Sequence, residues 1–409
     1  MVIVDYLHLL LFKLNMYQAS IIQIRHILHH QLQWLWQKPE MAMSIAPIML
    51  WGAPGTGKSS IIRDLCKEQN IGLIDVRLAQ REPVDLRGLP VPEGDQVRWL
   101  LSSEWPRDPN SRGIILFDEL TAADRTLQVA AYEFILDRRL GDLYRVPPGW
   151  LICAAGNRSE DRAVSMTLSS ALANRFCHVE LRPDFQSWTN WAASQGLHPD
   201  VIGFIRFKPE CFLQMTGNLE RGWPSPRSWE RVARTIEYAG EMDKSTLAVM
   251  VNGLVGTGVS TEFLAFRRAS QSLPDINGLL LGTVKFEIPK SADLRYAISS
   301  SLAHHLWTGP VSEREVRIGN FLRIGLLLSS DFAVMAMLDA QSRVASPERS
   351  EEAAALFSHP EFQRWLEKHG EGLNTESPTG HDDAGDFVGQ RTSRASAGIA
   401  KAIPVKKSH

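Results

Sequence analysis

The sequence predicts an α/β protein with a parallel sheet flanked by helices, followed by a mainly helical lid and C-terminal region. A glycine-rich loop at 52–59 stands between a strand-like run and a helix-like run. Two further apolar runs, 114–119 and 150–157, end in polar residues, as strands buried on both faces of a parallel sheet do. Beyond residue 183, apolar residues recur mainly at helical spacing.

The chain of 409 residues is long enough for more than one domain. We expect an N-terminal extension at 1–17, an α/β subdomain at 18–183 that carries the glycine-rich loop, a helical lid and C-terminal helical region at 184–373, and a disordered tail at 374–409. The tail is poor in apolar residues and rich in Ser, Thr, Gly, Asp and Lys, which predicts disorder.

The N-terminal extension is apolar, but Asp5 interrupts it and it is about ten residues too short to span a bilayer. We interpret it as an amphipathic helix or a translated extension ahead of Met16. A helix is predicted over 18–36, where apolar residues recur near helical spacing. Its three histidines, His26, His29 and His30, have no carboxylate or thiol nearby in sequence, so a solvated or internally bonded helix face fits better than a metal site.

The charge of the chain is nearly balanced, with 44 Lys and Arg against 46 Asp and Glu. A net charge of -2 provides no overall attraction to nucleic acid or acidic membranes, so we expect neither as a partner. The four cysteines, Cys66, Cys153, Cys177 and Cys211, contain no C-x-x-C pair. This predicts reduced thiols in a cytoplasmic protein rather than disulfides or a zinc site.

The loop reads GAPGTGKS and has the form G-x-x-x-x-G-K-[ST], entered from a strand-like run and left through a helix-like one. Its glycines allow successive N–H groups to turn inward around phosphate oxygens. Lys58 can reach the β- and γ-phosphates of a nucleotide, and the Ser59 hydroxyl is placed to ligate magnesium. The predicted nucleotide-binding residues of the loop are Gly52, Ala53, Pro54, Gly55, Thr56, Gly57, Lys58, Ser59 and Ser60. A plain Gly/Pro turn is the alternative, and the flanking pattern disfavours it.

A helix from Ser59 to about Gln69 and a strand over 71–78 are predicted next. The segment 79–106 is dense in Pro, Gly and charge, and we expect a structured excursion rather than a regular element. A helix is then expected over 121–136, followed by a hairpin over 138–146. Three arginines and a tyrosine in this hairpin leave two interpretations open, a solvated hairpin and an element that contacts a pore or a partner.

Two acids, Asp118 and Glu119, end the apolar run that begins at Ile114. They fall at the carboxyl end of a predicted parallel strand, where such sheets bind their ligands. Asp118 is predicted to hold Mg²⁺, directly or through water, and Glu119 to polarise the water that attacks the γ-phosphate. Taken alone such a pair is common, but its position downstream of a phosphate loop favours the catalytic interpretation.

Three further polar residues complete the predicted site. Asn157 ends the strand-like run 150–157 and could orient the attacking water against the γ-phosphate, with a loop-capping Asn as the alternative. Arg175 is either a surface charge or a finger that stabilises the phosphoryl group transferred in a neighbouring subunit. Arg227 follows Pro226 at the head of a predicted helix, which fits a loop that delivers a cation.

The remaining chain is predicted to be helical, over 187–195, 201–208, 228–239, 294–307, 313–338 and 351–367. A second glycine cluster at Gly253, Gly256 and Gly258 is not followed by Lys, so we assign no second nucleotide site to it.

With these residues assembled, the chain resembles the AAA+ ATPases, and within them the MoxR family. The likeness covers roughly residues 18 to 300. It is carried by 51–59 as Walker A, 114–119 as Walker B, 154–157 as sensor 1, 173–176 as the arginine-finger motif and 225–227 as sensor 2. The stretches 75–90 and 155–163 also resemble that family's sequences.

The resemblance implies an ATPase that uses ATP and Mg²⁺ in a homo-oligomeric ring, usually a hexamer, with ATP between subunits. It also implies that 81–99 and 138–145 are inserts facing the pore or a client. Such proteins remodel or activate protein clients as chaperones, often with a partner that carries a von Willebrand factor A domain. Two alternatives stay open: an AAA+ nucleic-acid motor or loader, which the near-neutral charge disfavours, and a scaffold that binds ATP and barely hydrolyses it.

Overall fold

The structure is a computed structural model that describes residues 18–158, 161, 166–215, 221–240, 242–345 and 347–375. The predicted extension 1–17 and the tail from 376 onward lie outside the described residues. The chain forms two compact units, and each is described by itself. The first unit runs to Asp184 and includes Ser225–Arg227; the second takes most of the chain from Phe185 onward.

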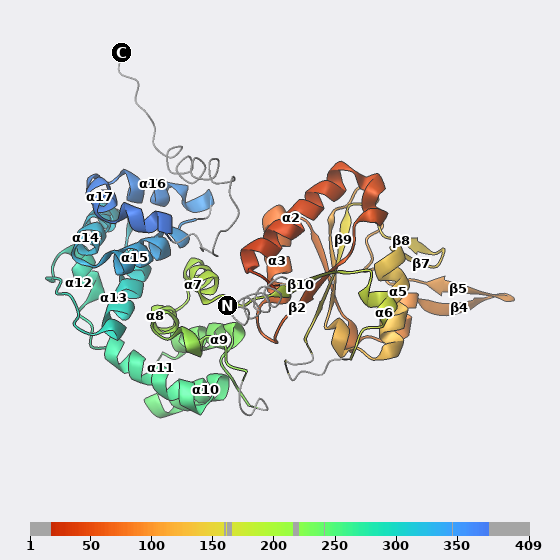
Figure 1. The fold of residues 1–409 in the computed structure, drawn as a ribbon, viewed down its shortest axis with the longest axis horizontal. Coiled ribbons are helices and arrows are strands. Elements are labelled where there is room, and N and C mark those ends of the chain that lie inside the picture. The colour runs from red at the N-terminus through yellow and green to blue at the C-terminus, as the bar shows by residue number, and fades with distance from the viewer. Residues whose placement is uncertain are drawn as a thin grey trace, which may run out of the picture. The chain divides into compact units, whose positions relative to one another are not determined.

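The first unit is built on a six-stranded sheet with the order β1-β10-β2-β9-β6-β3 (Figure 1). All neighbouring strands in this sheet are parallel. The strands are β1 Gln18–Ala19, β2 Ile48–Trp51, β3 Gly72–Arg77, β6 Gly113–Asp118, β9 Trp150–Gly156 and β10 Cys177–Leu181. With helices on both faces, and a mainly helical second unit, the predicted α/β fold class is confirmed.

Consecutive residues of the central strands enter two different cores. Ile114 of β6 packs with the core under α2 (Ile21–Gln37) and α3 (Lys58–Gln69), whereas Ile115 packs with the core under α5 (Arg125–Asp137). Figure 1 shows α2 and α3 on one side of the sheet and α5 with α6 (Ser170–Ala173) on the other. Burial on both faces explains why these strands appear in the sequence as continuous apolar runs.

The helix α2 begins three residues later than predicted, because a short edge strand precedes it. Gln18 and Ala19 pair with β10, so the helix begins only at Ile21. Ser20 caps it: the Ser20 hydroxyl accepts from the Gln23 amide, and the Gln23 side chain accepts from the Ser20 amide. This capping box satisfies two N-terminal donors that would otherwise lack partners.

The expectation of no regular element in 79–106 is wrong. A short helix, α4 (Pro83–Arg87), is followed by an antiparallel hairpin of β4 (Leu89–Glu93) and β5 (Gln96–Leu100). Gly94 makes the turn with a φ of +67°. The hairpin strands are exposed along almost their whole length, so they carry no alternation between apolar and polar residues that would predict a strand.

The second predicted hairpin is present, with β7 (Arg139–Leu140) paired to β8 (Tyr144–Arg145). Short 3₁₀ helices connect several elements: η1 Pro39–Ser44, η2 Leu78–Gln80, η3 Leu120–Ala122, η5 Pro209–Cys211, η6 Val311–Glu313 and η7 Pro347–Arg349.

The second unit is helical and has two hydrophobic cores, one formed by helices of the span α7 to α11 together with Ala297 of α13, and one by helices from α12 to α17. Its helices are α7 Phe185–Ser194, α8 Pro199–Phe207, α9 Pro226–Tyr238, α10 Lys244–Val255, α11 Thr257–Ser270, α12 Ile276–Leu281, α13 Ala292–His305, α14 Arg314–Leu327, α15 Ser330–Ser342, α16 Ser350–Ser358 and α17 Pro360–Thr375.

Two predicted long helices are each divided in the structure. The predicted helix 313–338 breaks where Leu328 takes an extended conformation, and α15 begins at Ser330. The predicted helix 351–367 breaks at His359, because the residue before a proline disfavours helical backbone angles. The helix α17 then continues to Thr375, inside the predicted tail.

Gly256 separates α10 from α11 with a φ of +80°, so the second glycine cluster marks a helix break.

Across the described ranges, no helix combines the length and the apolar content needed to cross a membrane.

Candidate active site

The glycine-rich loop runs from the end of β2 to the first residue of α3. Gly55 and Gly57 have φ angles of +78° and +98°, which side chains rarely tolerate. A Cβ on Gly55 would also lie 3.1 Å from the Ser225 hydroxyl oxygen. Within the described residues no side chain caps the start of α3, so its first amides are open to an anion. This is the backbone geometry that a phosphate-binding loop needs.

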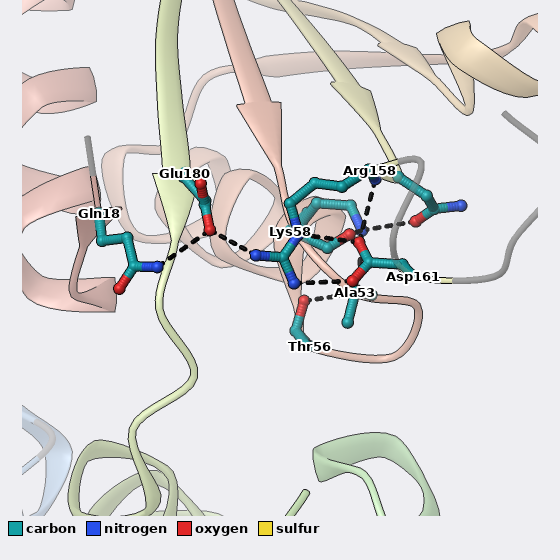
Figure 2. Close-up of polar contacts among 9 residues, drawn as sticks. Gln18, Ala53, Thr56, Lys58, Arg158, Asp161 and Glu180 are labelled. Carbon is teal, nitrogen blue, oxygen red and sulfur yellow. Dashed lines mark hydrogen bonds and ion pairs between the residues drawn. The ribbon is translucent and has the colours of Figure 1, made fainter. Parts of the chain in front are cut away.

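Lys58 is buried at the base of the loop and is held by neutral oxygens (Figure 2). Its Nζ donates to the carbonyl of Gly52 at 2.6 Å, to that of Ala53 at 3.0 Å, and to the Asn157 Oδ1 at 3.0 Å. Burial lowers the pKa of Lys58 to about 8, against the opposing effect of the Asp118 and Asp161 carboxylates. A phosphate placed here would raise the pKa of this lysine again, because a nearby negative charge favours the protonated amine.

This pKa predicts pH-dependent ATP binding. Between pH 8 and 10.5 the unfolded chain holds more protons on Lys58 than the folded chain, so this group makes the fold more stable as pH rises through that window. Phosphate binding needs the protonated amine, so above pH 8 affinity for ATP should fall by up to about tenfold per pH unit.

Calorimetry at pH 9 in buffers of different ionisation enthalpy measures this as uptake of protons on ATP binding. The matched variant Lys58→Arg should take up none, because its guanidinium stays protonated. Equal uptake by both proteins would show that Lys58 is not the group that titrates.

Ser59 and Asp118 offer adjacent oxygen ligands at the ends of α3 and β6. The Ser59 hydroxyl donates to the Asp118 Oδ2 at 2.5 Å. Hydroxyl and carboxylate oxygens suit Mg²⁺, which commonly takes one or two protein ligands together with nucleotide phosphates. No group of three or more His, Cys, Asp or Glu side chains in the described part of the chain is arranged as a closed metal site. The pair therefore fits Mg²⁺ that arrives with a nucleotide.

Glu119 follows Asp118 in a strained turn. It is an exposed, non-glycine residue with a φ of +56°, and its amide donates to the Asp118 Oδ1 at 2.9 Å. The left-handed conformation costs about 1–2 kcal/mol for a residue with a Cβ. The two neighbouring acids therefore have different surroundings. Asp118 contacts Ser59, whereas Glu119 is exposed to solvent.

Asn157 lies just beyond the end of β9 and joins that strand to the loop. Its Oδ1 accepts from Lys58, and its amide donates to the Thr121 hydroxyl at 3.1 Å. The preceding Gly156 is required by packing, since a Cβ there would lie 2.7 Å from the Thr121 Cγ2. Because β2, β9 and β6 are neighbours in the sheet, their carboxyl ends bring Lys58, Asn157 and Asp118 together.

The two predicted arginines differ in their surroundings. The Arg227 amide donates to the Gly55 carbonyl at 3.2 Å, and its charge helps to lower the pKa of Lys58. Arg175, in the turn between α6 and β10, instead donates to the Tyr132 hydroxyl at 2.8 Å and lies 5.6 Å from that ring's centroid. Among the described residues, then, the structure joins Arg227 to the loop but holds Arg175 on α5.

Sequence reasoning missed a charged network beside the loop. Arg158 donates from Nη2 to the buried Asp161 carboxylate at 2.7 Å and from Nη1 to Glu180, and Gln18 donates to Glu180 at 3.1 Å. Figure 2 shows the Arg158 guanidinium between the two carboxylates. The hydrogen bond to Asp161 raises the pKa of Arg158. The network ties the end of β9 to β10 and β1.

No family model matches the chain. The chain is similar to NtrX from Brucella abortus in complex with ADP, at 16% identity and a TM-score of 0.32, over 83% of this chain and 68% of that one. It is also similar to a proline-to-glycine mutant of RuvB from Thermotoga maritima, at 14% identity and a TM-score of 0.35, over 75% of this chain and 91% of that one.

Proposed function

We propose that the chain is an ATP-binding and ATP-hydrolysing AAA+ ATPase. The observation that carries this proposal is the meeting of Lys58, Asp118 and Asn157 at the carboxyl ends of neighbouring parallel strands. A glycine-rich loop followed by a helix with no side-chain cap binds phosphate. Asp118, at the end of β6, is an acid placed to bind the metal ion that accompanies the phosphate. The resemblance of the sequence motifs to AAA+ proteins supports the same assignment.

Each residue has a separate task in the proposed reaction. The loop amides and Lys58 hold the β- and γ-phosphates, and Ser59 with Asp118 would hold Mg²⁺, which supplies charge neutralisation on the phosphates when bound. Glu119 polarises the attacking water, and Asn157 orients it against the γ-phosphate. Arg175 provides a cation to the neighbouring subunit's site, where it stabilises the charge that develops during transfer.

We further propose that the protein works as a MoxR-type chaperone in a ring of identical subunits, with six as the expected number. The β4–β5 hairpin supports a protein client, because it exposes the apolar side chains of Leu89, Val97 and Trp99. A partner with a von Willebrand factor A domain is part of this proposal. The cysteines are free, and three of the four are buried, which fits the proposed cytoplasmic location.

The charges of the arginine hairpin favour a protein client over a nucleic acid. Arg138 is buried and donates to the Pro147 and Trp150 carbonyls, so it supports the hairpin from inside. Arg139 pairs with Glu133 at 3.2 Å, which leaves Arg145 as the exposed cation without an ion pair in the described residues. One such charge is too few for a groove that tracks a phosphate backbone.

The test is a capture experiment with Glu119→Gln, which should keep ATP and its client bound. Proteins retained with ATP by Glu119→Gln, but not by the matched Lys58→Ala variant, would support the chaperone function. Binding of single- or double-stranded DNA is measured in parallel at low and high salt. Tight, salt-sensitive DNA binding that is lost in an Arg139→Ala, Arg145→Ala double variant would overturn the chaperone function in favour of a nucleic-acid motor.

A further inference from the structure

A chain of hydrogen bonds connects the strand before the phosphate loop to the segment that carries Arg175. Trp51, the last residue of β2, donates from its indole Nε1 to His178 Nδ1 at 2.8 Å. On its other side, His178 Nε2 lies 2.7 Å from the Ala173 carbonyl oxygen. Ala173 ends α6, directly before Asn174 and Arg175.

The indole fixes the tautomer of His178. An indole N–H can only donate, so the Nδ1 that receives it must be the unprotonated nitrogen of the ring. The proton is therefore on Nε2, which donates to the Ala173 carbonyl. His178 thus acts as a neutral bridge with one acceptor and one donor, and both are used.

The ring packing supports the same arrangement. The Trp51 and His178 rings stack with centroids 5.9 Å apart and an interplanar angle of 21°. In the register of the two strands, Trp51 is opposite Glu180 and His178 is opposite Met49, so the contact is a diagonal pair across neighbouring parallel strands. An exposed histidine would otherwise be free to sample other rotamers; two hydrogen bonds and a stacked ring restrict it.

We propose that His178 is a positioning residue that couples the phosphate loop of a subunit to its own Arg175, the finger offered to the neighbouring subunit. Trp51 directly precedes Gly52, so a shift of the loop is passed through the indole and the imidazole to the end of α6. From there it reaches the turn that holds Arg175. This inference rests on the proposed ATPase function and on the trans role of Arg175.

Mixed rings separate this role from a general stabilising one. Acceptor subunits carry Arg175→Ala, so their sites are intact but receive no finger from one another. Donor subunits carry Glu119→Gln, so their own sites are inactive but their fingers are intact. Turnover in the mixture therefore reports donor fingers in acceptor sites.

His178→Phe in the donor keeps a ring but loses both hydrogen bonds. Because the two bonds act in series, breaking either one interrupts the coupling, so rescued turnover should fall about fivefold, the effect of losing roughly one hydrogen bond. The same change in the acceptor should leave it within about twofold. Trp51→Phe in the donor keeps the stacked ring and removes only the indole donor, and should reproduce the donor effect if His178→Phe folds poorly. His26→Phe, at an exposed position on α2, is the matched control and should change nothing.

Full rescue of turnover by both donor variants would overturn the inference. Equal losses of turnover from His178→Phe in the donor and in the acceptor would also overturn it, because they would indicate a structural role. If the Glu119→Gln donor with its native His178 fails to rescue Arg175→Ala, the trans role of Arg175 itself is wrong. That result is distinct from failure of the His178 coupling.

Discussion

Replacing Arg175 with Ala is expected to lower ATP turnover by about 10³-fold or more, with ATP still bound. A finger arginine neutralises charge that develops on the transferring phosphoryl group, and it contributes about 10³–10⁵ to kcat in GTPases. Among the described residues, the contacts of this guanidinium are with the hydroxyl and the ring of Tyr132. Under the trans role proposed for Arg175, its effect requires a neighbouring subunit.

Turnover at saturating ATP and the dissociation constant for ATP are measured on the same preparation. Arg63→Ala is the matched control, because Arg63 is another exposed arginine of the first unit and forms a surface ion pair, at 3.3 Å with Asp75. Turnover of Arg175→Ala within tenfold of the unmodified chain would argue for a plain surface charge.

Replacing Glu119 with Gln should lower turnover by about 10²–10⁴-fold, the range for losing a general base. The change is nearly isosteric, so the strained turn at this position is kept and only the carboxylate is removed. Lys58, Ser59 and Asp118 are untouched, so ATP affinity should stay within about threefold of the unmodified chain.

Single-turnover hydrolysis and ATP binding are compared in the same samples. Glu68→Gln, at an exposed carboxylate on α3, is the matched control and should keep normal turnover. If Glu119→Gln hydrolyses ATP at the unmodified rate, the water-polarising group lies elsewhere.

Most of the sheet could be predicted because its strands are locally recognisable. The predicted run 150–157 matches β9 (Trp150–Gly156) to within one residue, because its apolar residues are followed directly by a polar one. The hairpin of β4 and β5 could not be predicted, because neither strand faces a core and so neither shows alternation. The helix breaks at Leu328 and His359 were missed because apolar spacing continues across them.

The candidate site divides in the same way. Lys58, Asp118 and Asn157 each end or follow a recognisable run, so they could be grouped from the sequence. The contacts of Arg158 with Glu180 and of Trp51 with His178 could not be predicted, because they form only once the sheet order places β10 between β1 and β2. Gln18 and Glu180 are far apart in sequence, and no local pattern connects them.

The most direct test of whether this loop is an ATPase site is a measurement of phosphate release from ATP. The purified chain is compared with its Lys58→Ala variant. The unmodified chain should release phosphate at saturating ATP and Mg²⁺, and Lys58→Ala should neither bind ATP measurably nor release phosphate above background. The proposed function would be contradicted by equal release from the two proteins, or by an unmodified chain that binds no ATP.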